Sequence, residues 1–144
     1  MSLEAAREHV DLASKQWERA ATDAWEPSDP ASCVTNAFYA YENLIVAVAE
    51  AKDVAWSRNH YKKAALAKDL ARNGVLSKDL SDEVLRLNDL RKDVSYGEPG
   101  AELLDADLEN LVTELESVIN EVDDFVGRLE AEEEEIEGDE KRNE

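Results

Sequence analysis

Apolar residues recur every three or four positions along most of this chain, the spacing of one face of an α-helix. The widest stripe runs from Leu104 to Leu129. Strand-like alternation is absent, and so are internal repeats. We therefore expect an all-α fold, a five-helix up-and-down bundle. Its helices should cover residues 3–24, about 30–51, about 59–73, from 77–81 to about 96, and from 103–105 to about 129.

Residues that favour helix ends mark these boundaries. Ser2 is a predicted N-cap, and Asp29 is another, with Pro30 at the first helical position after it. The pair Asn73-Gly74 suits the end of the third helix. The segment 30–51 is the most apolar of the five, so we expect it at the centre of the bundle.

The chain has 144 residues, enough for one domain with a sizeable core, and we assign residues 1–129 to it. Residues 130–144 contain nine acidic and two basic residues. Because this segment has so few apolar side chains, we expect a frayed helix end that passes into a disordered acidic tail. Such a tail either solvates the C-terminus or folds back on a basic segment of the same chain.

The formal net charge is −19, which opposes unspecific contact with nucleic acid or anionic membranes. The charge is uneven, because residues 58–92 hold nine Lys/Arg against five Asp/Glu and carry +4, whereas the remainder carries −23. The single Cys33 excludes an internal disulfide and fits a reducing, cytoplasmic setting. No stretch resembles a signal peptide or a membrane span. An acidic surface of this kind is also found in proteins of salt-loving organisms.

Arg91 interrupts an apolar stripe formed by Leu80, Val84, Leu87 and Val94. A guanidinium does not lose its proton, so a buried Arg91 needs a partner. The alternatives are a buried carboxylate such as Glu42 or a residue of a second copy of the chain. Five positions later the helix should end at Tyr96, because a glycine and then a proline follow.

The stretch from Arg91 to Tyr96 resembles the signature of HEPN domains, small all-helical domains in which an Arg precedes a His by four to six residues. Tyr96 stands where the ribonuclease members carry the His, and Lys92 occupies the polar position after the Arg. The similarity extends as a helix pattern over residues 33–129 and includes residues 38–42. It implies a homodimer in which two motifs share one cleft, the Arg holds the scissile phosphate, and the His moves a proton without a metal.

The resemblance and the basic segment together define the candidate site. Its catalytic candidates are Arg91 and Tyr96, with His60 as the residue that would replace the missing base if the fold brings it near Arg91. An unperturbed phenol titrates near pH ~10, so Tyr96 is a poor substitute for His. The predicted phosphate or RNA contacts are Arg91, Lys92, Lys62, Lys63 and Arg72. These bases can equally serve to neutralise acidic helices packed beside them.

The sequence contains no motif for a metal, nucleotide or redox cofactor site. The two His and one Cys have no metal-ligand spacing, so we expect no metal site and no cofactor. A P-loop, a dinucleotide fingerprint and a Glu-x-x-His pair are all missing.

Three functions remain. The resemblance implies a HEPN-like module, non-catalytic or weakly catalytic, in an RNA-linked toxin–antitoxin or phage-defence setting, beside a nucleotidyltransferase partner. The alternatives are an active metal-independent endoribonuclease that uses Arg91 with Tyr96 or His60, and a helical protein–protein adaptor.

Overall fold

The computed structural model describes residues 2–25, 28–96 and 105–142, and in that part every regular element is a helix. The five helices are α1 (Leu3–Ala24), α2 (Pro30–Ala51), α3 (His60–Arg72), α4 (Ser81–Tyr96) and α5 (Asp105–Arg142). They form a bundle, so the all-α prediction is confirmed. The turn expected at Gly97 and Pro99 lies outside the described residues.

Side chains and prolines at the predicted positions start and stop the helices. The Ser2 hydroxyl accepts a hydrogen bond from the Ala5 amide, and Asp29 accepts one from the Ser32 amide ahead of Pro30. At the end of α3 the chain reverses at Gly74, whose φ of 73° lies in the left-handed region that favours glycine. The predicted caps at these three ends are therefore confirmed.

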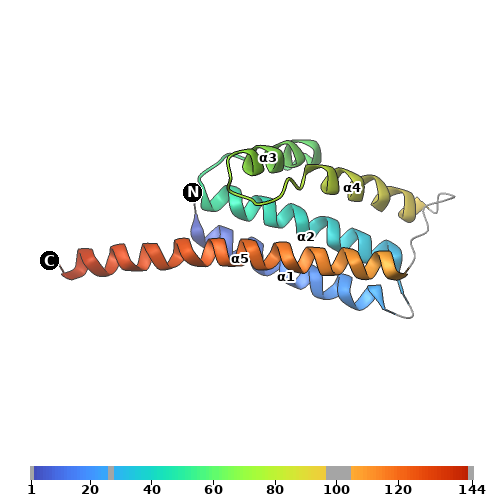
Figure 1. Ribbon diagram of the computed structural model, residues 1–144, viewed down its shortest axis with the longest axis horizontal. Helices are drawn as coiled ribbons and strands as arrows, with labels where there is room; N and C mark the ends of the chain where they lie inside the picture. Colours follow the sequence, from blue (N-terminus) through green and yellow to red (C-terminus); the bar gives the residue numbers. More distant parts are fainter. Residues whose placement is uncertain (1, 26–27, 97–104, 143–144) are drawn as a thin grey trace.

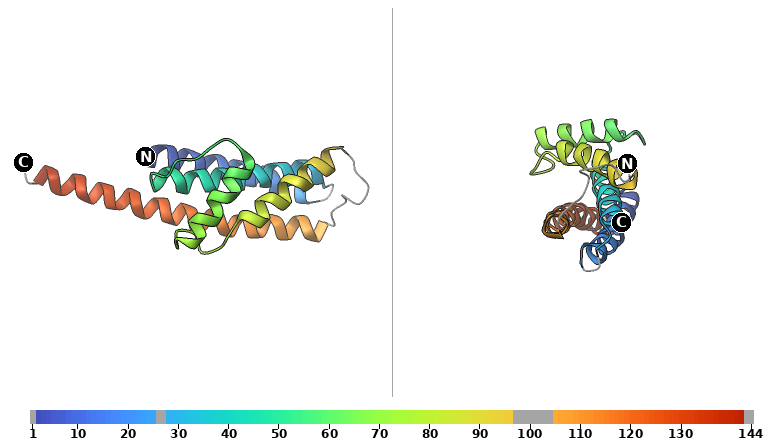
Figure 2. Two further views of the ribbon diagram at one scale, coloured as in Figure 1. Left: turned by 90° about the horizontal axis from the view of Figure 1, so that it is seen from above. Right: turned by 90° about the vertical axis from the view of Figure 1, so that its right-hand side faces the viewer.

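α2 is the centre of the bundle and contacts each of the other four helices. In Figures 1 and 2, α3 and α4 lie on one side of α2, and α1 and α5 lie on the other. α1, α2, α4 and α5 alternate in direction along the long axis, whereas the shorter α3 crosses at an angle (Figure 2). The burial of α2 follows from its sequence, since apolar side chains occupy nearly its whole circumference.

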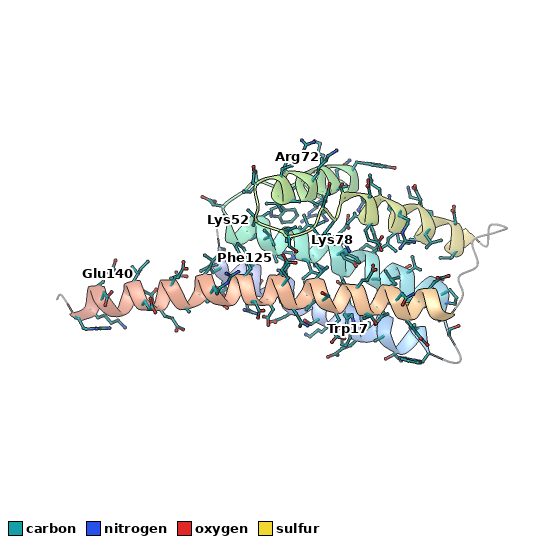
Figure 3. All side chains as sticks on the ribbon, viewed as in Figure 1. Trp17, Lys52, Arg72, Lys78, Phe125 and Glu140 are labelled. Atoms are coloured by element: carbon teal, nitrogen blue, oxygen red, sulfur yellow. The ribbon has the colours of Figure 1, made fainter. Side chains whose placement is uncertain are left out.

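α1 packs closely against its neighbours because its buried positions are mostly alanines. Ala6, Ala13 and Ala20 are fully buried and leave little space between the backbones. Trp17 is the one large side chain of this stripe, and its indole N–H donates to the Val112 carbonyl of α5 at 2.9 Å. That contact joins the first helix to the last (Figure 3).

The end of α5 differs from our expectation. We predicted that the helix ends near residue 129 and gives way to an irregular tail, but α5 continues to Arg142 and extends beyond the bundle (Figure 1). Glutamate, alanine and lysine are good helix formers, and lengthening a helix already held by packing needs no new nucleation. The extension also does not fold back on α3, because Glu140 and Arg72 project from well-separated parts of the molecule (Figure 3).

None of the described helices combines the length and apolar character needed to cross a lipid bilayer.

Candidate functional site

Residues from three helices meet around one aromatic ring. Phe38 of α2 is fully buried. The guanidinium carbon of Arg91, in α4, lies 5.1 Å from the centre of the Phe38 ring, within cation–π range. The imidazole of His60, in α3, meets the same ring edge-on at 5.2 Å between centroids. The fold therefore brings His60 and Arg91 to one place, although 31 positions separate them in the sequence.

Arg91 does not pair with Glu42, one of the two alternatives that we drew from the sequence. Its Nη2 donates to the Asn88 side-chain oxygen at 2.8 Å, and Asn88 is buried one helical turn earlier. The half-buried guanidinium also lies 5.8 Å from the ring centre of Tyr39, which is partly exposed. Its Nε is buried and has no hydrogen-bond partner among the described residues. Arg91 thus keeps donor capacity and positive charge beside aromatic rings.

Glu42 is instead bound by two residues of α3. Only 3 % of Glu42 is exposed, and burying a carboxylate is costly unless it is paired. The His60 Nδ1 lies 2.7 Å from one carboxylate oxygen, and the Lys63 Nζ lies 3.6 Å from the other. Both partners are in the first turn of α3, where residues three apart share a face. This turn is fixed by Asn59, whose side chain accepts from the Lys62 amide.

The remaining predicted site residues are more dispersed. Lys62 and Lys92 are exposed, and Arg72 lies in the last turn of α3, far along the helix from His60. The side chain of Tyr96 lies outside the part of the chain that the structure describes. Of the predicted residues, Arg91, His60 and Lys63 are therefore brought together, and Lys62, Lys92 and Arg72 are not held in that cluster.

Sequence reasoning missed three members of the cluster. Phe38 was noted within the HEPN-like stretch 38–42, and Asn88 was given no role. Glu42 was considered only as a partner of Arg91. The sequence did indicate that Glu42 is unusual, because it is an acidic residue inside the most apolar helix.

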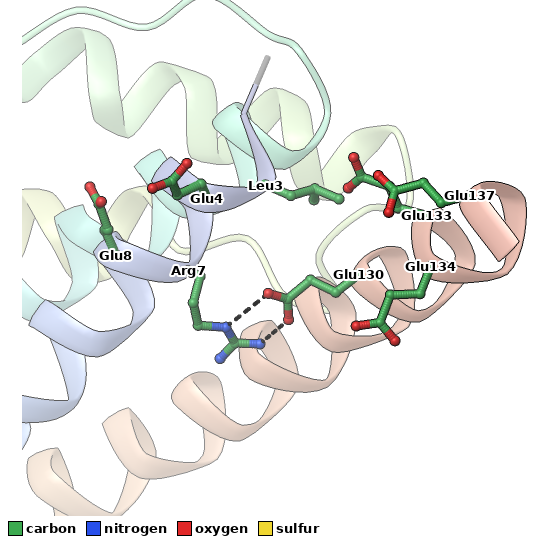
Figure 4. A pocket seen from close by; sticks show the side chains of 8 residues that line it. All are labelled: Leu3, Glu4, Arg7, Glu8, Glu130, Glu133, Glu134 and Glu137. Atoms are coloured by element: carbon green, nitrogen blue, oxygen red, sulfur yellow. Dashed lines mark hydrogen bonds and ion pairs between the residues drawn. The ribbon is translucent and has the colours of Figure 1, made fainter. Parts of the chain in front are cut away.

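A second polar cluster lies between the start of α1 and the C-terminal part of α5. A groove of about 430 Å³ separates the first turns of α1 from the far part of α5, and Figure 4 shows its lining. Its only basic residue is Arg7, bonded to Glu130, and its acidic residues are Glu4, Glu8, Glu130, Glu133, Glu134 and Glu137. Within the described residues no group of His, Cys, Asp or Glu side chains is arranged to hold a metal ion.

The cluster around Phe38 has the chemistry of an anion site with an adjacent titratable group. Arg91 offers a positive charge and N–H donors, as phosphate recognition requires. His60 has a side chain that is 37 % exposed, so solvent and a ligand reach its ring. Comparison of the chain with protein-family models, with curated proteins and with solved structures gives no match.

Proposed function

We propose that this protein is a HEPN-like helical module that binds single-stranded RNA at the Phe38 cluster and is non-catalytic or weakly catalytic. The observation that carries the proposal is the position of the half-buried Arg91 guanidinium beside two aromatic rings, with a buried Nε that has no hydrogen-bond partner among the described residues. The sequence resemblance around Arg91 and Tyr96 supplies the family and the RNA-linked toxin–antitoxin or phage-defence setting. It also supplies the expectation of a homodimer and of a nucleotidyltransferase-type partner.

Two physical features favour RNA as the ligand. The guanidinium can hold a phosphate, and Tyr39 beside it exposes 37 % of its surface, so its ring can stack on an unpaired base. Lys63 and the exposed Lys62 add positive charge at the start of α3. Elsewhere the surface is strongly acidic, so RNA contact should be confined to this region.

Weak or absent catalysis follows from the motif itself. Proton transfer from a 2′-hydroxyl at neutral pH needs a group that titrates near pH 7, which a histidine provides and an unperturbed tyrosine does not. Because Tyr96 replaces the motif histidine, Arg91 is left to hold a phosphate without the usual proton acceptor.

Binding of a fluorescent single-stranded RNA, measured by anisotropy at several salt concentrations, tests the proposal. We expect Arg91→Ala to weaken binding by about tenfold, since a charged hydrogen bond contributes roughly 1.5–3 kcal/mol. Arg91→Lys should recover part of this loss, because it keeps the charge but not the planar donor group. Binding should also fall steeply with salt.

Arg86→Ala is the matched control. Arg86 belongs to the same helix and is occupied by Glu83, at 2.8 and 3.1 Å. Wild-type protein that fails to bind RNA at low salt, or an Arg91→Ala variant that binds as well as the wild type, would contradict the proposal and favour the adaptor function.

A metal-independent endoribonuclease is the second candidate. It is favoured by one observation, the contact of the His60 imidazole and the Arg91 guanidinium with the same ring. Strong RNA cleavage in the presence of a chelator, lost in Arg91→Ala, would establish it over the non-catalytic module.

A further inference from the structure

We infer that Glu42 and His60 act as a dyad, in which Glu42 positions the His60 ring so that its Nε2 takes a proton from the 2′-hydroxyl of an RNA held at Arg91. This inference rests on the proposed function, that RNA binds at the Phe38 cluster, and adds the group that transfers the proton. His60 is the catalytic residue, and Glu42 is a positioning residue that does not touch the RNA.

The geometry of Glu42 and His60 assigns these roles. The carboxylate accepts from Nδ1 at 2.7 Å, so the proton of a neutral imidazole resides on Nδ1. The other ring nitrogen, Nε2, is then a free acceptor, and 37 % of the His60 side chain is exposed. An acceptor nitrogen that is held in one orientation and open to solvent is the arrangement that a general base requires.

The surroundings of Glu42 keep this arrangement in place. The carboxylate is almost completely buried and cannot turn to solvent. Its second oxygen faces the Lys63 Nζ at 3.6 Å, and the side chain of Lys63 is only 13 % exposed. The charged groups around His60 are thus Glu42 from α2, Lys63 from α3, and Arg91 from α4 across the Phe38 ring.

The edge-on contact with Phe38 also limits rotation of the His60 ring. Phe38 meets the imidazole at an interplanar angle of 65° and also carries the Arg91 guanidinium. In the proposed complex, a nucleotide whose phosphate is bound by Arg91 lies with its ribose toward His60.

The reaction that this geometry supports is a transesterification without water or metal as reactant. The 2′-oxygen forms a bond to phosphorus while its proton passes to His60 Nε2, and the bond from phosphorus to the 5′-oxygen breaks. The leaving 5′-oxygen takes a proton from solvent, and the imidazolium later returns its proton to solvent. The products are a 2′,3′-cyclic phosphate and a 5′-hydroxyl. Arg91 stabilises the charge that develops on the phosphorane.

Single-turnover cleavage of a labelled single-stranded RNA by the full chain, with chelator present, tests the dyad. We expect slow cleavage by the wild type and a loss of about 100-fold in His60→Ala, which is the usual size of a general-base contribution. Glu42→Gln keeps the hydrogen-bond acceptor but removes the charge, and it should lower the rate by about tenfold or more. The affinity for RNA, measured by anisotropy, should stay unchanged in Glu42→Gln.

The chain offers matched controls for both residues. His9 is the other histidine, and its Nδ1 contacts the Asn43 side-chain oxygen at 2.8 Å. Glu50, in the same helix as Glu42, accepts from the Trp56 indole N–H at 3.0 Å. Neither residue bonds Arg91 or Phe38 in the part of the chain that the structure describes, and we expect His9→Ala and Glu50→Gln to cleave at the wild-type rate.

Two further readouts separate positioning from folding. In ¹⁵N spectra of the imidazoles, wild-type His60 should show a protonated Nδ1 and an unprotonated Nε2, and Glu42→Gln should change the signals of His60 but not of His9. Free imidazole should restore part of the activity of His60→Gly. A fold defect would affect neither signal selectively and would not be rescued.

The outcomes distinguish failure of the Glu42–His60 dyad from failure of RNA binding. Wild-type protein that binds RNA without cleaving it, or cleavage that survives in His60→Ala, would overturn the dyad and leave RNA binding intact. Absence of RNA binding in the wild type would overturn the proposed function and the dyad together. A product that ends in a 3′-phosphate monoester from its first appearance would also contradict the dyad.

Discussion

Arg7 and Glu130 are joined by two hydrogen bonds, at 2.7 and 3.5 Å, although 123 positions separate them in the sequence. Arg7 also bonds Asp123, almost two turns earlier in α5, so one guanidinium joins the start of α1 to the long helix at two points. The two carboxylates hold the pKa of Arg7 well above its usual value, mainly because Arg7 donates hydrogen bonds to Glu130. This clamp marks where α5 stops contributing to the bundle.

We predict that removal of residues 131–144 leaves the stability of the bundle nearly unchanged, because most of that segment projects into solvent. Arg7→Ala should instead lower the free energy of unfolding by about 0.5–1 kcal/mol, the range of partly exposed ion pairs. Urea denaturation of the full chain, the truncated chain and Arg7→Ala measures both effects. A truncation that lowers the melting temperature by several degrees would show that the extension of α5 packs on the bundle.

The helices could be predicted from the sequence because their signals are local. Asp29 with Pro30, and Asn73 with Gly74, specify their helix ends through contacts within a few residues. The extension of α5 was missed for a related reason. Composition alone does not distinguish a solvated acidic tail from a solvated acidic helix, and the difference depends on the packed turns that precede residue 130.

The candidate site could be predicted only in part, since its contacts depend on how helices are rotated against one another. Sequence analysis named Arg91 and His60, but it considered Glu42 only as one of two alternative partners of Arg91. The rotation of α3 decides that His60 and Lys63 face α2, and nothing local to either helix specifies that angle. Asn88 could have been noticed, because a polar residue three positions before Arg91 shares its helix face.

A homodimer remains a prediction, with α4 near the interface. Arg91 contacts residues of its own chain, so it no longer requires a partner subunit. The homodimer prediction now depends on the sequence resemblance and on the half-buried Val94, one turn after Arg91. Light scattering at micromolar concentration should report twice the mass of the 16.1 kDa chain, more completely at high salt, which screens the charge of −19. Val94→Glu should yield a monomer with unchanged helix content, whereas the exposed Asp93→Ala should not. A wild-type monomer at high salt and high concentration would contradict the prediction.

Cys33 should be inert in the native protein. Its side chain is fully buried in the first turn of α2, and burial, with smaller contributions from Asp23 and Asp29, raises the pKa of the thiol to about 11. Because the thiolate is the reactive form, a disulfide reagent should not modify native protein at pH 8 and should modify one thiol per chain after denaturation. Rapid modification of native protein would show that α2 opens at its N-terminus.

The same thiol predicts how stability depends on alkaline pH. A group whose pKa is higher in the folded state stabilises the fold below the unfolded pKa, and this contribution is lost as the pH rises through the folded value. For Cys33 the window runs from about 9.0 to about 11, and buried Tyr41, whose pKa burial raises from 10.0, adds to the loss from about pH 10 upward. Unfolding free energy should fall by on the order of 1 kcal/mol from pH 8 to pH 10. Cys33→Ala should show a smaller fall over this range.

The last prediction concerns Tyr96→His, which restores the residue that the resembled motif carries in ribonucleases. The wild type is expected to cleave RNA poorly, because an unperturbed phenol does not titrate near neutral pH and a histidine does. An added imidazole beside a bound phosphate should raise the single-turnover rate by about tenfold or more, as general acid–base groups do. Arg91→Ala combined with Tyr96→His should abolish the gain, because the phosphate is then no longer held.

Tyr96→Phe is the matched control for this change. It removes the phenol hydroxyl and keeps the ring, so wild-type cleavage should be unaffected if Tyr96 transfers no proton. Strong wild-type cleavage that disappears in Tyr96→Phe would instead assign the proton transfer to the phenol, and it would make the protein an active ribonuclease of the kind that uses Arg91 with Tyr96. If Tyr96→His binds RNA as the wild type does and gains no activity, position 96 does not face the phosphate held by Arg91. The histidine of α3 would then be the imidazole that remains to act there, and its loss in the Tyr96→His background would remove any residual cleavage.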